Sequence, residues 1–204
     1  MSSAVGIIDI GISNLGSIVQ SLKMVGREVV VISNPTIPKG VDRIILPGVG
    51  AYGAAVNKLN ASNLAEKIKQ VATSGMPILG ICLGMQLLCT RSLEFGEHKG
   101  LNLVPGDVKR MDPKLLNIRV PNMGWHNVSP ENKSQLLPNE PQFFYHLHSF
   151  FTTPSDDTDR AGYITLNGHK ITVAVERQNV FGVQFHPEKS QDYGLDLLDR
   201  FCNL

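Results

Sequence analysis

One cysteine of this chain lies between two glycines, directly after an apolar run. The run Pro77–Ile81 predicts a buried strand, and Gly80-Ile81-Cys82-Leu83-Gly84 predicts a sharp turn into a helix. At a helix N-terminus the dipole and the free N–H groups favour a thiolate. We therefore predict that Cys82 is a nucleophile on a turn like the Ser-centred nucleophile elbow. We expect Cys89, in the helix after the turn, and Cys202, in a terminal helix, to be core residues.

A histidine and a carboxylate lie two residues apart near the end of the chain, at His186 and Glu188. On an extended segment, side chains at positions i and i+2 point to the same side. His186 would take the thiol proton, and Glu188 would hold the other imidazole nitrogen. Together with Cys82 they form a candidate Cys-His-Glu catalytic triad.

A glycine-rich turn, Pro47-Gly48-Val49-Gly50, follows another predicted strand that should end beside the cysteine strand. Glycines allow a peptide to reorient. The turn predicts an oxyanion loop, in which N–H groups near Val49 and Gly50 join that of Leu83. An ordinary strand-ending turn is the alternative interpretation.

We expect no cofactor. The glycine spacing in Gly11-Ile12-Ser13-Asn14-Leu15-Gly16 does not match the dinucleotide-binding motif. His146 and His148 are two residues apart but lack further convincing metal ligands.

Apolar strands that alternate with helical patterns predict the elements that hold these residues. Strands are expected at Val5–Ile8, Val29–Ile32, Arg43–Leu46, Pro77–Ile81 and Val180–Phe185. Helices are expected at Leu15–Val25, capped by Asn14, at Ala54–Leu59, at Leu64–Ser74, capped by Ser62 or Asn63, and around Leu195–Phe201. Tyr163–Leu166 and Ile171–Val175 predict a hairpin with an Asn-Gly turn. The pattern indicates a three-layer α/β fold: a mostly parallel sheet with helices on both faces and an antiparallel extension, in one domain over residues 1–204.

Composition excludes several classes of protein. Of the 204 residues, 42% are hydrophobic and 18% charged, and the net charge of +1 does not favour binding to nucleic acid or an acidic membrane surface. No apolar run is long enough to span a bilayer, and Met1–Val5 lack the basic region of a signal peptide. Three cysteines, an odd number, do not suggest a disulfide framework. We expect a cytoplasmic protein with free thiols.

The motifs together resemble the triad class of glutamine amidotransferases. The segment Gly80–Gln86 is similar to that of the glutaminase subunits of imidazole glycerol phosphate synthase, and four further segments agree: Pro47–Gly50, Met123–Trp125, His148-Ser149 and Gly182–Ser190. The resemblance implies that Cys82 attacks the carboxamide of L-glutamine, so that ammonia leaves and water then cleaves a glutamyl thioester.

The same resemblance implies a glutamine pocket lined by six residues: Gly50, Gln86, Glu94, His148, Ser149 and Phe150. Glu94 would pair with the ammonium group of the substrate. The alternative interpretations are a solvated helix-end charge for Glu94 and a helix-surface amide for Gln86.

The implied partner is a (β/α)-barrel cyclase subunit, which receives the ammonia in a heterodimer. Trp125 and Lys189 would lie at that interface, although Trp125 could equally be a core aromatic. Asn122 and His126 depart from the family pattern, where His and Asn are usual. A related subunit that supplies ammonia for surface-sugar biosynthesis is therefore an alternative. A cysteine peptidase-like protein of the same fold and a catalytically silent docking module are more remote ones.

Overall fold

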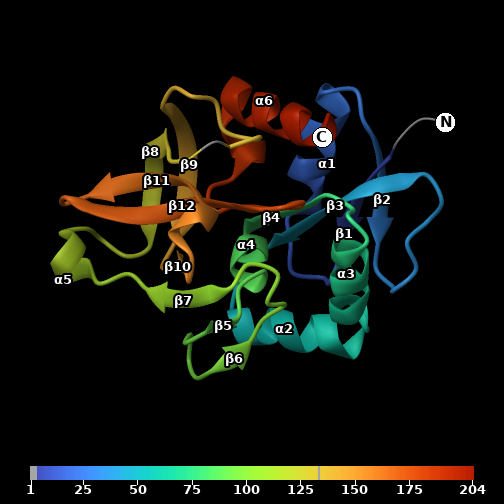
Figure 1. Ribbon diagram of the computed structural model, residues 1–204, viewed down its shortest axis with the longest axis horizontal. Coiled ribbons are helices and arrows are strands. Elements are labelled where there is room, and N and C mark those ends of the chain that lie inside the picture. The colour runs from blue at the N-terminus through green and yellow to red at the C-terminus, as the bar shows by residue number, and fades with distance from the viewer. Residues whose placement is uncertain (1–3, 133) are drawn as a thin grey trace.

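The computed structural model describes residues 4–132 and 134–204 and contains a nine-stranded central sheet of order β2-β1-β3-β4-β13-β12-β11-β8-β9 (Figure 1). Its parallel half consists of β1 (Ala4–Ile8), β2 (Glu28–Ile32), β3 (Val41–Gly48), β4 (Ile78–Cys82) and β13 (Val180–Val183). Its antiparallel half adds β12 (His169–Arg177), β11 (Arg160–Leu166), β8 (Asn122–Pro130) and β9 (Gln142–His148). The predicted fold class is confirmed; the parallel part has five strands and the antiparallel extension four.

Helices cover both faces of the parallel half. Side chains alternate between the faces along β3, so Ile45 packs in one core with Leu22 and Phe201. These two residues belong to α1 (Leu15–Met24) and α6 (Gln191–Cys202). Ile44 packs in the opposite core with Leu59, which belongs to α2 (Tyr52–Ala61). The helices α3 (Leu64–Thr73) and α4 (Leu83–Leu87) contribute to that second core (Figure 1).

A second, four-stranded sheet of order β10-β7-β5-β6 lies beside α4 and was not predicted from the sequence. It is built from β5 (Arg91–Ser92), β6 (His98–Lys99), β7 (Gly106–Arg110) and β10 (Phe150–Pro154). Strands of two residues are too short to show a periodic pattern. A short helix, α5 (Pro113–Leu116), follows β7, and two 3-10 turns span Asp157–Asp159 and Pro187–Lys189.

The predicted elements are present, with some differences at their ends. Asn14 occupies the N-cap position of α1, but its amide donates to Ser17 Oγ instead of accepting from the helix. The Asn167-Gly168 turn joins β11 to β12 with φ values of 47° and 77°, as a tight hairpin requires. Cys89 lies beyond the end of α4 because that helix has only five residues, although the thiol is buried as expected.

No helix within the described ranges has both the length and the apolar composition that a membrane span requires.

Candidate active site

The predicted nucleophile stands on a strained turn. Cys82 ends β4 and directly precedes α4, with φ 55° and ψ −111°, a conformation that residues with a Cβ rarely adopt. A Cβ on Gly84 would lie 1.7 Å from the carbonyl oxygen of Leu46, so α4 packs directly onto the backbone of β3. This close approach pulls the start of α4 against the sheet and leaves the cysteine at the carboxyl edge of the parallel strands.

The predicted base and acid lie beside the cysteine and are bonded to each other. His186 Nδ1 donates to Glu188 Oε1 at 2.8 Å, and their side chains are only 5% and 3% exposed. Burial alone would lower the pKa of His186, but hydrogen bonds with Cys82 and Glu188 outweigh this effect and raise the pKa to about 9. The imidazole thus lies between the Cys82 sulfur and a carboxylate, and both favour its protonated form.

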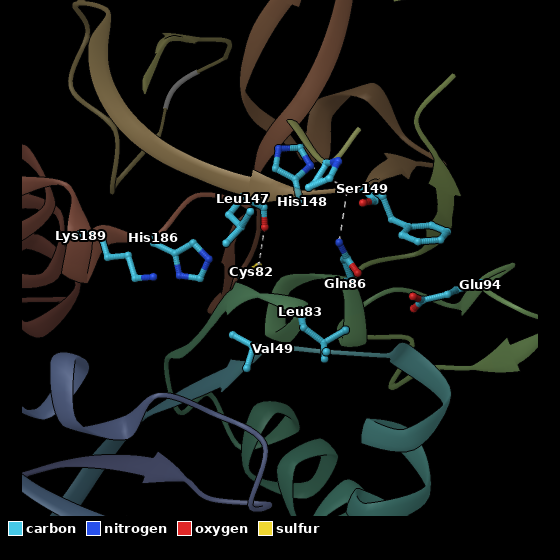
Figure 2. A pocket seen from close by; sticks show the side chains of 13 residues that line it. Val49, Cys82, Leu83, Gln86, Glu94, Leu147, His148, Ser149, His186 and Lys189 are labelled. Atoms are coloured by element: carbon cyan, nitrogen blue, oxygen red, sulfur yellow. Dashed lines mark hydrogen bonds between the residues drawn. The ribbon is translucent and has the colours of Figure 1, made fainter. Parts of the chain in front are cut away.

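Cys82 and His186 open onto a cavity of about 270 Å³ (Figure 2). Eleven of the residues singled out in the sequence line it: Val49, Gly50, Cys82, Leu83, Gln86, Glu94, His148, Ser149, Phe150, His186 and Lys189. Pro121 and Leu147 also line it and were not predicted; the Cys82 thiol contacts the Leu147 carbonyl oxygen at 3.9 Å. Glu188 lies behind His186, outside this cavity. The volume suits a ligand the size of an amino acid.

A buried amide that the sequence analysis did not single out links two of these residues. Gln184 Oε1 accepts from Gln86 Nε2 at 2.9 Å, and Gln184 Nε2 donates to Cys82 Sγ at 3.6 Å. Both glutamines are buried, so the interpretation of Gln86 as a helix-surface amide is wrong. Gln184 lies within the Gly182–Ser190 motif, and its position two residues before His186 was the available signal.

Glu94, which is predicted to bind the substrate ammonium group, also accepts a hydrogen bond from the protein backbone. Glu94 Oε2 accepts from the backbone N–H of Tyr52 at 2.7 Å, at the first residue of α2. A carboxylate at this place satisfies a helix N–H that has no intrahelical acceptor and interacts favourably with the helix dipole. Glu94 is only 9% exposed, so the interpretation as a solvated charge is wrong.

Histidines next to the cavity form a neutral hydrogen-bonded group. His148 Nδ1 donates to the Phe150 carbonyl oxygen at 2.9 Å, which leaves Nε2 to accept from Asn122 Nδ2 and His146 Nδ1, both at 3.3 Å. Burial lowers the pKa of His148 to about 4. Burial and the neighbouring histidines hold the pKa of His146 well below its usual range. Asn122, where the resembling family usually has His, thus donates a hydrogen bond to His148, which lines the cavity.

The candidate oxyanion loop is held by a hydrogen bond outside the cavity. The backbone N–H of Val49 donates to the Ile12 carbonyl oxygen at 3.0 Å, and Ile12 does not line the cavity. Gly50 follows with φ 98°, where glycine is favoured. The N–H of Leu83 belongs to the first residue of α4 and has no intrahelical acceptor.

Comparisons with known proteins agree with this geometry. The model of the family described as glutamine amidotransferase class-I matches residues 6–203. The chain belongs to this family. The relative named imidazole glycerol phosphate synthase subunit HisH from Wolinella succinogenes is 41% identical over 204 residues, covering 98% of this chain and 99% of the relative. A relative of the same name from Methanothermobacter thermautotrophicus is also 41% identical over 201 residues, covering 98% of each chain.

Solved structures show the same fold at lower identity. A chain of PurLQS from Thermotoga maritima superposes with a TM-score of 0.78 at 20% identity, covering 100% of this chain and 99% of that one. A structure titled glutamine amidotransferase reaches 0.76 at 17% identity, covering 98% and 100% of the two chains.

In this class-I glutamine amidotransferase, the predicted interface residues lie on a face outside the cavity core. Trp125 is 44% exposed, so the interpretation as a core aromatic is wrong. Its ring meets Tyr145 edge to face with centroids 6.1 Å apart, and Lys189 Nζ lies 5.7 Å from the same tyrosine ring. Lys189 also lines the cavity, so this aromatic surface is continuous with the site.

Among the residues that the structure describes, no group of three or more His, Cys, Asp or Glu side chains is arranged to hold a metal ion.

Proposed function

We propose that this protein is the glutaminase subunit of an imidazole glycerol phosphate synthase, and that it hydrolyses L-glutamine to glutamate and ammonia in the cytoplasm. The observation that carries the proposal is that the Cys82 elbow and His186, which is bonded to Glu188, line the same cavity of about 270 Å³. The relatives at 41% identity bear the name of that subunit, which supports this branch of the family.

The chemistry follows from the positions of these groups. The Cys82 thiolate attacks the carboxamide carbon of glutamine, and the protonated imidazole of His186 gives its proton to the departing amide nitrogen. Ammonia leaves and a glutamyl thioester remains. Water then attacks the thioester carbon while His186 accepts its proton, which releases glutamate and restores the thiolate–imidazolium pair. Glu188 holds Nδ1 and stabilises the imidazolium throughout.

The oxyanion of each tetrahedral intermediate needs N–H donors. Leu83 supplies one from the start of α4. Val49 and Gly50 supply a second only after the bond from Val49 N–H to the Ile12 carbonyl is broken and the peptide turns. We propose that the observed arrangement is the resting one and that partner and product binding complete the oxyanion hole.

Glutamine would occupy the cavity with its carboxamide at Cys82. Gln86, Glu94, His148, Ser149 and Phe150 line the remainder of the cavity, along with Gly50. The Glu94 carboxylate, one oxygen of which accepts from the Tyr52 N–H, would attract the substrate ammonium group.

A (β/α)-barrel cyclase subunit would receive the ammonia. The exposed Trp125 and the adjacent Lys189 lie on a face that is continuous with the cavity, which is where a channelling partner must dock. Mixing the chain with the histidine-pathway cyclase, and separately with a surface-sugar synthase, tests this assignment. Ammonia release that rises only with the cyclase supports it, and a response only to the sugar synthase would assign the chain to the other pathway.

The catalytic part of the proposal is tested by Cys82→Ala. This variant should release no ammonia from glutamine with the partner present, and its far-UV circular dichroism should match the wild type. Cys202→Ala removes an equally buried thiol far from the cavity and is the matched control. Glutamine turnover by Cys82→Ala would refute the triad.

A further inference from the structure

The acid of the candidate triad has one oxygen without a partner. Glu188 Oε1 accepts from His186, but Oε2 is buried and has no hydrogen-bond partner among residues 4–132 and 134–204. A carboxylate has acceptor positions on both oxygens, and a buried one is normally satisfied on both. The orientation of Glu188 about its terminal bond therefore depends on a group beyond the imidazole.

A second cavity, of about 30 Å³, is lined by Glu188 and shares Val49, His186 and Lys189 with the glutamine cavity. It lies where three loops meet: the loop after β1, the loop after β3 and the loop that carries His186 and Glu188. This is enough room for at least one water molecule. Ser13 also lines it, and the Ser13 hydroxyl oxygen is buried without a partner in the described part of the chain.

These observations complement one another. A carboxylate oxygen can only accept, whereas a hydroxyl both donates and accepts. A water molecule between them can donate to Glu188 Oε2 and accept from Ser13 Oγ, which satisfies both side chains. We propose that this cavity is a binding site for one ordered water and that Ser13, acting through it, is a positioning residue for the acid of the triad. The catalytic consequence rests on the function proposed above.

The position of Ser13 gives it a second connection to the site. Its neighbour Ile12 accepts a hydrogen bond from the backbone N–H of Val49, so one short loop lines the cavity beside the candidate triad acid and also holds the candidate oxyanion loop. A displacement of this loop would therefore affect both the candidate triad acid and the candidate oxyanion loop.

A high-resolution crystal structure of the wild-type chain tests the water site directly. We expect density for a water within about 3 Å of both Glu188 Oε2 and Ser13 Oγ. Absence of that water, or a water that contacts only one of the two oxygens, would overturn the proposal without the need for any variant.

Kinetics of Ser13→Ala, measured as ammonia release with the barrel partner present, test the positioning role. We expect kcat to fall about fivefold, the effect of one lost hydrogen bond in the transition state. KM should not change because Ser13 does not line the glutamine cavity. The low-field proton resonance of His186 Nδ1–H should shift as well. Ser13→Thr, which keeps the hydroxyl, should recover most of kcat.

Ser33→Ala is the matched control, because Ser33 is exposed at the same edge of the sheet, just after β2, and lies outside this cavity. Wild-type kcat and an unshifted resonance in Ser13→Ala would overturn the positioning role, as would equal losses in Ser13→Ala and Ser13→Thr. Turnover by Cys82→Ala would instead refute the triad itself, so the two failures are distinguishable.

Discussion

His148 should make the folded chain sensitive to mild acid. Its Nδ1–H donates to Phe150, its ring is buried, and burial lowers the pKa of His148 to about 4. In the unfolded chain the pKa returns to about 6.5. Between these two values the unfolded chain binds a proton that the folded chain does not, so the stability present above pH 6.5 is lost as the pH falls towards 4. From pH 7.5 to 4.5 this loss is about 2.5 kcal/mol.

Urea unfolding at pH 7.5 and 4.5 measures the loss, and a variant without the imidazole separates it from other titrating groups. The wild type should lose about 2.5 kcal/mol more than His148→Gln on acidification. His169→Gln, which removes an exposed histidine at the start of β12, should lose as much as the wild type. Equal losses in His148→Gln and the wild type would refute the assignment of a neutral, buried His148.

Three further substitutions test other parts of the site. Gly84→Ala places a Cβ 1.7 Å from a carbonyl oxygen of β3. It should lower the free energy of unfolding, measured by urea titration, by at least about 3 kcal/mol. The control Gly16→Ala adds a Cβ at an open helical position and should cause no such loss. Gln184→Leu removes one of the two acceptors of the buried Gln86 amide, the other being the Phe150 carbonyl oxygen, and should cost about 1–3 kcal/mol of stability, together with lower kcat. Unchanged stability would contradict the buried link. Glu94→Gln keeps an oxygen that can accept from the N–H at the start of α2 but removes the charge. KM for glutamine should therefore rise at least about tenfold, while stability changes by less than about 1 kcal/mol. An unchanged KM would refute the contact between Glu94 and the substrate ammonium group.

The Cys82 turn and the His186–Glu188 pair could be predicted because each depends on local sequence. A strand, a glycine-flanked cysteine and a helix describe the elbow almost completely, and the hairpin turn at Asn167-Gly168 is equally local. The alternation of apolar strands and helices likewise predicted the parallel half of the sheet.

Other features depend on contacts between distant segments. The link from Gln86 to Gln184 joins residues 98 positions apart, and the bond from Val49 to Ile12 joins two loops. Neither leaves a periodic pattern in the sequence. The second sheet was missed for a related reason, because β5 and β6 have only two residues each and depend on pairing for their conformation.

The contact between the start of α4 and β3 is made by main-chain atoms on both sides. Peptide groups are the same in every protein, so the spacing of helix and strand at this point does not change when the surrounding side chains diverge. Solved structures only 17–20% identical to this chain share its fold, with TM-scores of 0.76–0.78. In this chain the height of the Cys82 sulfur above the sheet is therefore set by a main-chain contact, whichever side chains line the cavity.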